Sequence, residues 1–189
     1  MILEECNLNL NTHKIFVPLK DTKILHSLKI SDKVSITGEL FVFRDQVHKK
    51  IHSGQVSQIS NINFQNSAVY YCAATEAKEG FVIGSCGPTS SYRMDDYTEK
   101  VLSLGVRIMI GKGYRSSKVV EFCKKYGAIY LITYGGCGAL INRWVKSVEL
   151  VAYPELETEA MYKYWVEGFE GIVAIDVYGN TLWKNFDLC

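Results

Sequence analysis

The sequence has almost no net charge. Its 189 residues include 21 lysines and arginines against 20 aspartates and glutamates, a formal net charge of +1. A protein without an excess of basic residues lacks the field that holds a phosphate polymer or an anionic membrane. Neither a nucleic acid nor a membrane is therefore an expected partner, and any anion site has to be built locally.

Long hydrophobic runs and a secretory signal are also missing. The longest strongly apolar stretch, residues 128–141, is too short to span a bilayer and contains three glycines. Residues 1–5 lack the basic start and the apolar run of a secretory signal. We therefore expect a cytoplasmic protein.

The cysteines are scattered singly, with no CxxC pair and no histidine at zinc-finger spacing. They are Cys6, Cys72, Cys86, Cys123, Cys137 and Cys189. Disulfide frameworks serve small secreted domains that lack a core, whereas 48% of these residues are hydrophobic. We expect reduced thiols, most of them buried as small apolar side chains. No metal site is predicted, and a cluster that needs three or four thiolates is not expected to be held by this chain alone.

The length fits a single domain over residues 1–189. Periodicity predicts strands at 33–43, 68–74, 106–110, 128–133, 148–152 and 172–177, the last turning at Gly179 and Asn180 into 181–183. Helices are predicted at 94–104, 116–126 and 155–165, and a loop with one short ordered piece at 53–67. The second helix can be capped by Ser116 or Ser117, and Gly127 ends it. Gly38 inside the first strand indicates a bulge or a close backbone approach. Together these elements predict an α/β domain with a mixed sheet or a second β layer.

The most informative segment is a loop rich in glycine and hydroxyl groups, residues 84–91, followed by a predicted helix. Free backbone N–H groups at a helix start attract a carboxylate or a phosphate. Thr89 can donate or accept a hydrogen bond, and Arg93 offers a planar guanidinium that suits a carboxylate. In the alternative, the two serines after Thr89 only cap the helix, and Arg93 pairs with Asp95 or Asp96.

A second candidate is Lys112, in a run of Ile-Gly-Lys-Gly that follows a predicted strand. Loops at the carboxyl ends of strands carry the sites of α/β sheets, and flanking glycines let the backbone approach a ligand. The run lacks the other elements of a nucleotide P-loop, so that motif is rejected. An ordinary turn lysine is the alternative. The later loop 135–138 contains Cys137, a weak nucleophile candidate.

The third segment, residues 43–52, places Arg44, His48 and His52 on one face if it is helical. Two histidines four residues apart occur in zinc helices, but the glutamate of such motifs and a third ligand are missing. The functional hypothesis is that Arg44 faces an anion, with Asp45 and His48 as supporting hydrogen-bond groups. A solvated helix face is the alternative.

Taken in order, these segments resemble the β subunit, or the C-terminal half of one-chain forms, of class I iron–sulfur fumarate hydratases and the related L-tartrate dehydratases. The resemblance covers nearly the whole chain, and the GPT-x-x-x-RMD and IGKG motifs in register are its most specific part. The matching features are Gly38 with Arg44, Asp45 and His48, then residues 87–95, then 110–113, then 126–131 with Gly135 and Gly136, and finally 172–176 with Gly179 and Asn180.

The resemblance implies a swivelling β/β/α domain that closes over a [4Fe–4S] cluster held by three cysteines of a separate α subunit. The implied assembly is a heterotetramer of two α and two β chains, active only when assembled. The implied reaction is the reversible hydration of a small dicarboxylate, fumarate, to malate. The alternative within the family is dehydration of L-tartrate to oxaloacetate.

The resemblance also assigns roles to residues. Thr89, Lys112 and Arg93 are the implied catalytic residues, with Thr89 as a base or proton relay. Arg44 joins these three around the substrate carboxylates. The implied supporting residues are Asp45, His48, Gly87, Ser90 and Gly111.

The sequence departs from the family pattern at a few positions. Ser90 replaces a second threonine, Glu170 replaces a proline, and residues 73–75 replace a Gly-Pro pair. These changes affect loops more than charges, so they leave the choice of substrate open. A non-catalytic anion-binding module that kept the fold is the alternative of a different class.

Overall fold

The computed structural model describes residues 12–183, so the predictions for residues 1–5, Cys6 and Cys189 lie outside the described residues. The strands are β1 (Thr12–Val17), β2 (Lys33–Val42), β3 (Ala68–Tyr70), β4 (Ile108–Gly111), β5 (Ile129–Ile132), β6 (Val145–Ala152) and β7 (Met161–Ile175). The α-helices are α1 (Lys23–Ser27), α2 (Asp45–His52), α3 (Thr98–Ser103), α4 (Ser117–Tyr126) and α5 (Gly138–Ile141). Short 3₁₀ helices are η1 (Ser57–Ile59), η2 (Ser91–Tyr97), η3 (Asn142–Trp144) and η4 (Pro154–Glu159).

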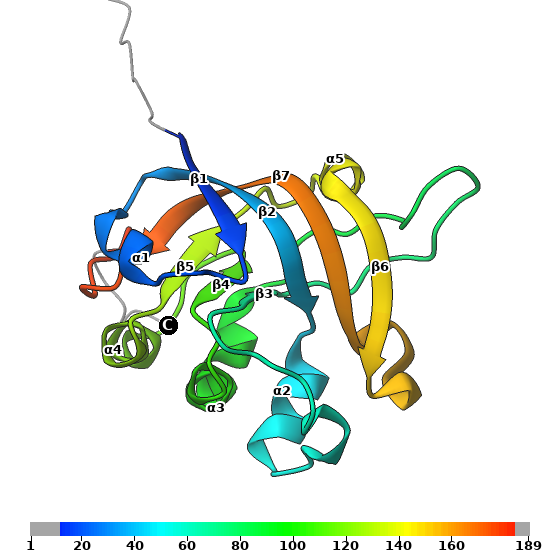
Figure 1. The fold of residues 1–189 in the computed structure, drawn as a ribbon, viewed down its shortest axis with the longest axis horizontal. Helices are drawn as coiled ribbons and strands as arrows, with labels where there is room; N and C mark the ends of the chain where they lie inside the picture. Colours follow the sequence, from blue (N-terminus) through cyan, green and yellow to red (C-terminus); the bar gives the residue numbers. More distant parts are fainter. Residues whose placement is uncertain (1–11, 184–189) are drawn as a thin grey trace, which may run out of the picture.

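The strands form one mixed sheet that closes on itself. β2, β3, β4 and β5 are parallel neighbours, β7 pairs antiparallel with β5, and β7 also pairs antiparallel with β2. Five strands therefore make a barrel-like ring, and β1 and β6 extend it beside β2 and β7. Helices α3 and α4 lie together on one side of the ring (Figure 1). The predicted α/β fold with a mixed sheet is confirmed.

The ring has apolar side chains on both faces of its parallel strands. In β4, Ile108 and Ile110 belong to the core inside the ring, whereas Met109 packs in a second core with residues of α3 and α4. In β3 and the residue after it, Tyr70 faces inward while Val69 and Tyr71 join the second core. Parallel strands buried on both faces have continuous apolar runs, which explains their lack of alternation.

Gly38 allows β1 to lie close against β2. Its φ is +127°, a side chain there would bring Cβ within 2.0 Å of the Val17 carbonyl oxygen, and the β2–β7 register shifts between Ile36 and Gly38. Both the predicted bulge and the predicted close approach are confirmed. No other residue type fits this position without displacing the backbone of β1.

Gly38→Ala is expected to lower the free energy of unfolding by about 2–4 kcal/mol, because it adds steric overlap to an unfavourable φ. Gly54→Ala is the matched control, since Gly54 has a φ of +79° and open space around it. That variant should lose only about 1 kcal/mol. Urea unfolding of both proteins measures the difference, and equal losses would contradict the assigned backbone contact.

The predicted helix at 155–165 is wrong. Residues of η4 form a 3₁₀ turn, and β7 begins at Met161. The reason is tertiary pairing, because Tyr164 lies opposite Leu40 of β2 on one side and Val148 of β6 on the other. Tyrosine, tryptophan and valine at 162–166 suit a strand once both neighbours satisfy its backbone.

Other boundaries are confirmed in part. The strand expected at 68–74 is shorter and is β3, and the one expected at 172–177 is the end of β7. The strand expected at 106–110 begins two residues later, whereas the one expected at 148–152 begins earlier, at Val145. Residues 181–183 contribute a single bridge at Thr181. The helix expected at 94–104 is split into η2 and α3. α4 ends as predicted at Gly127, whose φ is +60°, but Ser116 makes no side-chain capping bond. Within residues 12–183, no helix is long and apolar enough to cross a membrane.

Candidate functional site

Three of the predicted segments follow the carboxyl ends of neighbouring parallel strands. Arg44 comes two residues after β2, Lys112 directly follows β4, and the loop that contains Thr89 returns to the end of β3. The return is fixed by the Thr89 N–H, which donates to the Tyr71 carbonyl oxygen at 2.8 Å. The ring thus brings residues far apart in the sequence to one edge of the sheet, where α/β sheets place their sites.

The Thr89 loop and the Lys112 loop are joined by two hydrogen bonds between Ser91 and Lys112. The Ser91 N–H donates to the Lys112 carbonyl oxygen at 3.0 Å, and the Lys112 N–H donates to Ser91 Oγ at 3.1 Å. Gly111 makes this contact possible, because a Cβ there would come within 1.9 Å of Ser91 Oγ. The serine at 91 holds the two loops together, and neither it nor Ser90 caps η2 with its side chain.

Thr89 and Lys112 keep their functional groups free. Among residues 12–183 the Thr89 hydroxyl makes no hydrogen bond and the Lys112 ammonium makes no ion pair. The Lys112 stem passes Gly135, where a Cβ would lie 3.5 Å from Lys112 Cδ. A hydroxyl and an ammonium group without partners on adjacent loops are available to a ligand.

Arg44 and Arg93 are instead paired within the chain. Arg93 Nη2 donates to Asp45 Oδ1 at 2.9 Å, which contradicts the alternative pairing with Asp95 or Asp96. Arg44 pairs with Glu159 of η4 and lies 3.5 Å from Asp45 Oδ1 through its Nε. Two guanidinium groups thus share two carboxylates, and this cluster is close to neutral. Glu159 had no signal in the sequence, because it lies 115 residues from Arg44.

His48 is a buried member of α2. Its ring packs between Phe43 and Tyr71, with centroid distances of 5.0 and 5.3 Å. Nδ1 lies 2.8 Å from the Arg44 carbonyl oxygen, so His48 holds the backbone of Arg44. His48 thus contacts the backbone of Arg44 from inside the core, whereas His52 is exposed and its ring meets that of Tyr97 edge-on.

Protonation of His48 is expected to destabilise the fold. Burial lowers the pKa of His48 from 6.5 to about 4. Below pH 6.5 the unfolded chain protonates at His48, whereas the native state does not do so until about pH 4. The contribution of neutral His48 to the free energy of unfolding is therefore fully present above pH 6.5 and is lost as the pH falls towards 4. At about 1.4 kcal/mol per pKa unit the loss reaches about 3 kcal/mol.

Urea unfolding between about pH 7.5 and 4.5 measures this loss. The wild type and His48→Gln are compared at each pH, so that the titration of other groups cancels in the difference. The two stabilities should converge as the pH falls. Parallel pH profiles would contradict the buried neutral state of His48.

The sequence reasoning missed Arg115. Its side chain is fully buried, and its Nε donates to Asp95 Oδ1 at 2.6 Å. Burial opposes the charge, but the Tyr71 hydroxyl and the Asp95 carboxylate more than offset it, so the pKa of Arg115 is raised. A buried arginine was not predictable from local periodicity, because charged residues in loops are usually solvated.

Glycines in the 84–91 and 135–138 loops let the two backbones lie close together. A Cβ at Gly138 would come within 2.8 Å of the Gly87 N, and the Cys86 N–H donates to the Gly138 carbonyl oxygen at 3.2 Å. At Gly87 a Cβ would lie 3.5 Å from Gly138 Cα. Glycines of the 135–138 loop therefore let it pack against the Thr89 loop.

The cysteines of the described chain do not form a metal site. Cys72, Cys86 and Cys123 are buried, and burial raises the pKa of both Cys86 and Cys123 to about 12. Burial likewise raises the pKa of Cys72, so all three stay neutral thiols, and their burial is as predicted. Cys137 is exposed. Among residues 12–183, no three His, Cys, Asp or Glu side chains come together as a metal-binding group.

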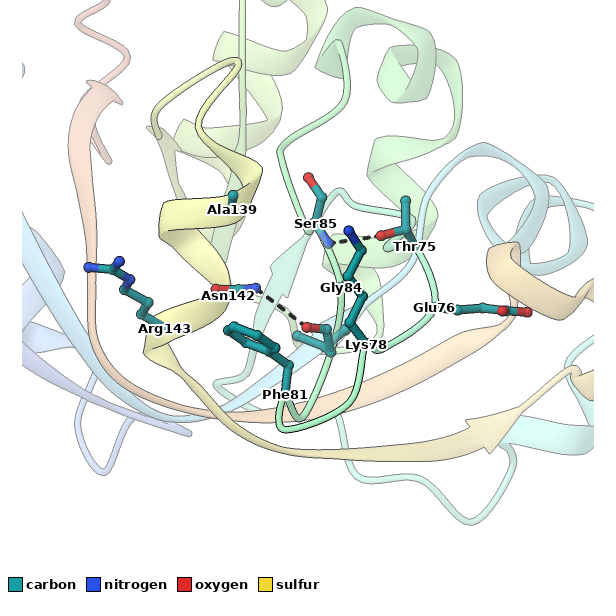
Figure 2. Close-up of a pocket in the computed structure, with 10 residues that line it drawn as sticks. Thr75, Glu76, Lys78, Phe81, Gly84, Ser85, Ala139, Asn142 and Arg143 are labelled. Carbon is teal, nitrogen blue, oxygen red and sulfur yellow. Dashed lines mark hydrogen bonds between the residues drawn. The ribbon is translucent and has the colours of Figure 1, made fainter.

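A surface cavity of about 560 Å³ lies on the same long loop but away from Thr89. Figure 2 shows it between residues 75–85 and the α5–η3 segment, with Ser85 N–H bonded to Thr75 Oγ1. None of Arg44, Thr89, Arg93 or Lys112 lines it. The cavity therefore includes the start of the 84–91 loop, through Gly84 and Ser85, but none of these four candidate residues.

Comparison with known proteins finds relatives over nearly the whole chain. The family model for the fumarase C-terminus matches residues 4–186. The aerobic class I fumarate hydratase of Escherichia coli K12 is 34% identical over 167 residues, which cover 87% of this chain and 30% of that protein. Fumarate hydratase 2 of Leishmania major is 34% identical over 163 residues, covering 85% and 29%.

A shorter relative matches along most of its own length. The putative L(+)-tartrate dehydratase subunit beta of Methanocaldococcus jannaschii is 32% identical over 172 residues, 87% of each chain. This chain therefore spans about 30% of the E. coli fumarate hydratase but most of a separate subunit.

Proposed function

Because the chain belongs to the fumarase C-terminus family, we propose that it is the β-type part of a hydro-lyase that interconverts fumarate and malate. The chain would act as a single swivelling β/β/α domain over residues 1–189. It would complete a dicarboxylate site on a separate α subunit, in an assembly of two α and two β chains.

One observation supports this proposal most strongly. The unpaired Thr89 hydroxyl and the unpaired Lys112 ammonium lie on two loops that Ser91 joins directly. Arg93 follows on the same segment as Ser91, and Asp45 links Arg93 to Arg44. A hydroxyl among several cations suits a substrate that carries two carboxylates and exchanges a proton.

Hydration adds a hydroxyl group to one carbon of the double bond and a proton to the other. We assign the proton transfer to the Thr89 oxygen, which takes the proton from malate in the reverse direction. A threonine hydroxyl is a poor base by itself, so the charge that develops on its oxygen needs nearby cations. We assign this role to Lys112 and Arg93.

The carboxylates of the substrate are assigned to Arg44, Arg93 and Lys112. Hydrogen bonds to charged groups contribute about 1.5–3 kcal/mol each. Arg44 and Arg93 already pair with Glu159 and Asp45. The substrate must therefore share these arginines with the two carboxylates or displace them, whereas Lys112 is available at once.

The family implies a [4Fe–4S] cluster, and the described residues of this chain do not fit one. Its three buried cysteines have raised pKa values and form no ligand group. We therefore propose that the α subunit holds the cluster. We assign to this chain only the binding of the substrate and the movement of its proton.

Two alternatives remain distinct. The relative in M. jannaschii, named as a putative L(+)-tartrate dehydratase subunit beta, favours dehydration of L-tartrate by the same residues. The pairings of Arg44 with Glu159 and of Arg93 with Asp45 favour a non-catalytic module, because among the described residues they leave only Lys112 of the three cations without a carboxylate partner.

The deciding experiment is anaerobic co-expression with the candidate α subunit, followed by kcat/KM measurements on fumarate, malate and L-tartrate. Turnover of fumarate that requires both chains supports the proposal. A preference for L-tartrate assigns the other substrate. A complex that holds its cluster but turns over none of them, or activity of this chain alone, contradicts it.

A further inference from the structure

Arg115 is a fully buried arginine that hydrogen-bonds to side chains of two other residues and lies against two aromatic rings. Its Nε donates to Asp95 Oδ1 at 2.6 Å, and its Nη2 donates to Thr98 Oγ1 at 2.7 Å. Its guanidinium also lies 5.4 Å from the ring centre of Tyr71 and 5.0 Å from that of Tyr130. Burying an ion pair is costly, and apolar residues of similar volume often stabilise a fold as well. Stability alone therefore does not account for this residue.

The partners of Arg115 attach the Lys112 loop to η2. Asp95 Oδ2 accepts a hydrogen bond from the Ser116 N–H at 2.6 Å, so Asp95 binds both Arg115 and the residue after it. At the other end of the loop, Lys112 is bonded to Ser91. Residues 91–95 and 112–116 are thus clamped together at both ends. Arg93 lies inside the first segment, and Lys112 begins the second.

The aromatic neighbours extend the contact to Thr89. Tyr71, whose ring lies against Arg115, accepts the Thr89 N–H with its carbonyl oxygen at 2.8 Å. The Tyr130 hydroxyl lies 2.9 Å from Ser91 Oγ and 3.0 Å from the Gly113 carbonyl oxygen. Arg115 therefore contacts Asp95, Tyr71 and Tyr130. These three residues belong to, or bond to, the segments that carry Arg93, Thr89 and Lys112.

We propose that Arg115 is a positioning residue that sets the placement of Thr89, Arg93 and Lys112 relative to one another. The inference rests on the proposed function, because the value of this placement is the alignment of a proton-transfer group with its cations. A shift of about 1 Å in such a group can cost a hundredfold in rate. Arg115 itself is buried behind the loops and has no accessible surface for substrate.

The test is Arg115→Lys in the assembled complex. This variant keeps the buried positive charge but loses the planar guanidinium and its several N–H donors. We expect kcat to fall at least about tenfold while KM changes less than about threefold. Hydrogen exchange in residues 91–95 and 112–116 should become faster. Arg107→Lys is the matched control, since among the described residues the Arg107 side chain donates only to the Leu102 and Val106 carbonyl oxygens, which belong to neither site loop.

A purely structural role predicts a different pattern. Arg115→Lys would then lower the melting temperature as Arg107→Lys does, with an unchanged kcat well below that temperature, and this result would overturn the proposal. If Arg115→Lys does not fold, Thr98→Val decides, because it removes one acceptor of Arg115 and keeps both charges. A lower kcat in that variant supports the positioning role, and an unchanged kcat overturns it.

Failure of the proposed function is distinguishable from failure of this inference. A wild-type complex inert on fumarate, malate and L-tartrate removes the function, and hydrogen exchange then decides the placement alone. Faster exchange in residues 91–95 and 112–116 of Arg115→Lys, but not of Arg107→Lys, supports the positioning role of Arg115. Unchanged exchange in both loops overturns it.

Discussion

Thr89→Ala is expected to reduce kcat of the assembled enzyme by about 10²–10⁴-fold, the range typical of a lost acid or base group. The variant removes the unpaired hydroxyl but leaves the Thr89 N–H bond to Tyr71 intact. Lys112 and Arg93 should therefore still bind substrate, and KM should change much less than kcat. Steady-state kinetics on fumarate and malate measure both constants.

Two further variants separate the hydroxyl from the loop that contains it. Thr89→Ser keeps the hydroxyl and should recover most of the activity. Ser85→Ala deletes an exposed serine four residues earlier on the same loop and should leave kcat unchanged. If Thr89→Ala retains wild-type turnover, another group moves the proton and the role assigned to Thr89 is wrong.

Asp95→Ala is expected to lower the free energy of unfolding by about 3–5 kcal/mol, because it leaves a buried charge without its partner. Arg115 is fully buried, so water cannot replace the carboxylate. The Ser116 N–H, 2.6 Å from Asp95 Oδ2, loses its acceptor as well. Urea unfolding of the wild type and the variant measures the loss.

The next residue along the chain is the matched control. The Asp96 side chain is 81% exposed, and its nearest cation, Lys118 Nζ, lies 3.9 Å away at the surface. Asp96→Ala should therefore lower the free energy of unfolding by less than about 0.5 kcal/mol. The two variants delete the same carboxylate one position apart. Equal losses would show that the buried pair with Arg115 contributes nothing particular to stability.

The charge balance of the site has a consequence for binding. Among Arg44, Arg93 and Lys112, only Lys112 lacks a carboxylate partner in the part of the chain that the structure describes. The family resemblance implied these three cations, and it named Asp45 as a supporting residue, but nothing in the sequence pointed to Glu159, because Glu159 lies on a different element, near the start of β7. The strength of the proposed anion site therefore depends on Glu159, a residue that no motif marks.

Local patterns were sufficient where a single element or motif carried the information. Alternation with an internal glycine predicted β2 and its bulge at Gly38, and a closing glycine predicted the end of α4 at Gly127. The motif around Thr89 and the one around Lys112 pointed to the family that the comparisons show. Each of these features depends on residues close together in the chain.

Tertiary structure decided the features that depend on distant partners. Residues 162–165 are in a strand rather than a helix because β2 pairs with them on one side and β6 on the other. Arg115 is buried because Asp95, 20 residues away, meets it between two loops. Arg93 turns to Asp45 because the ring brings the end of β2 beside η2. Hydrophobic periodicity records which face of a segment is buried, but register and ion pairing between distant segments are set only when the sheet closes.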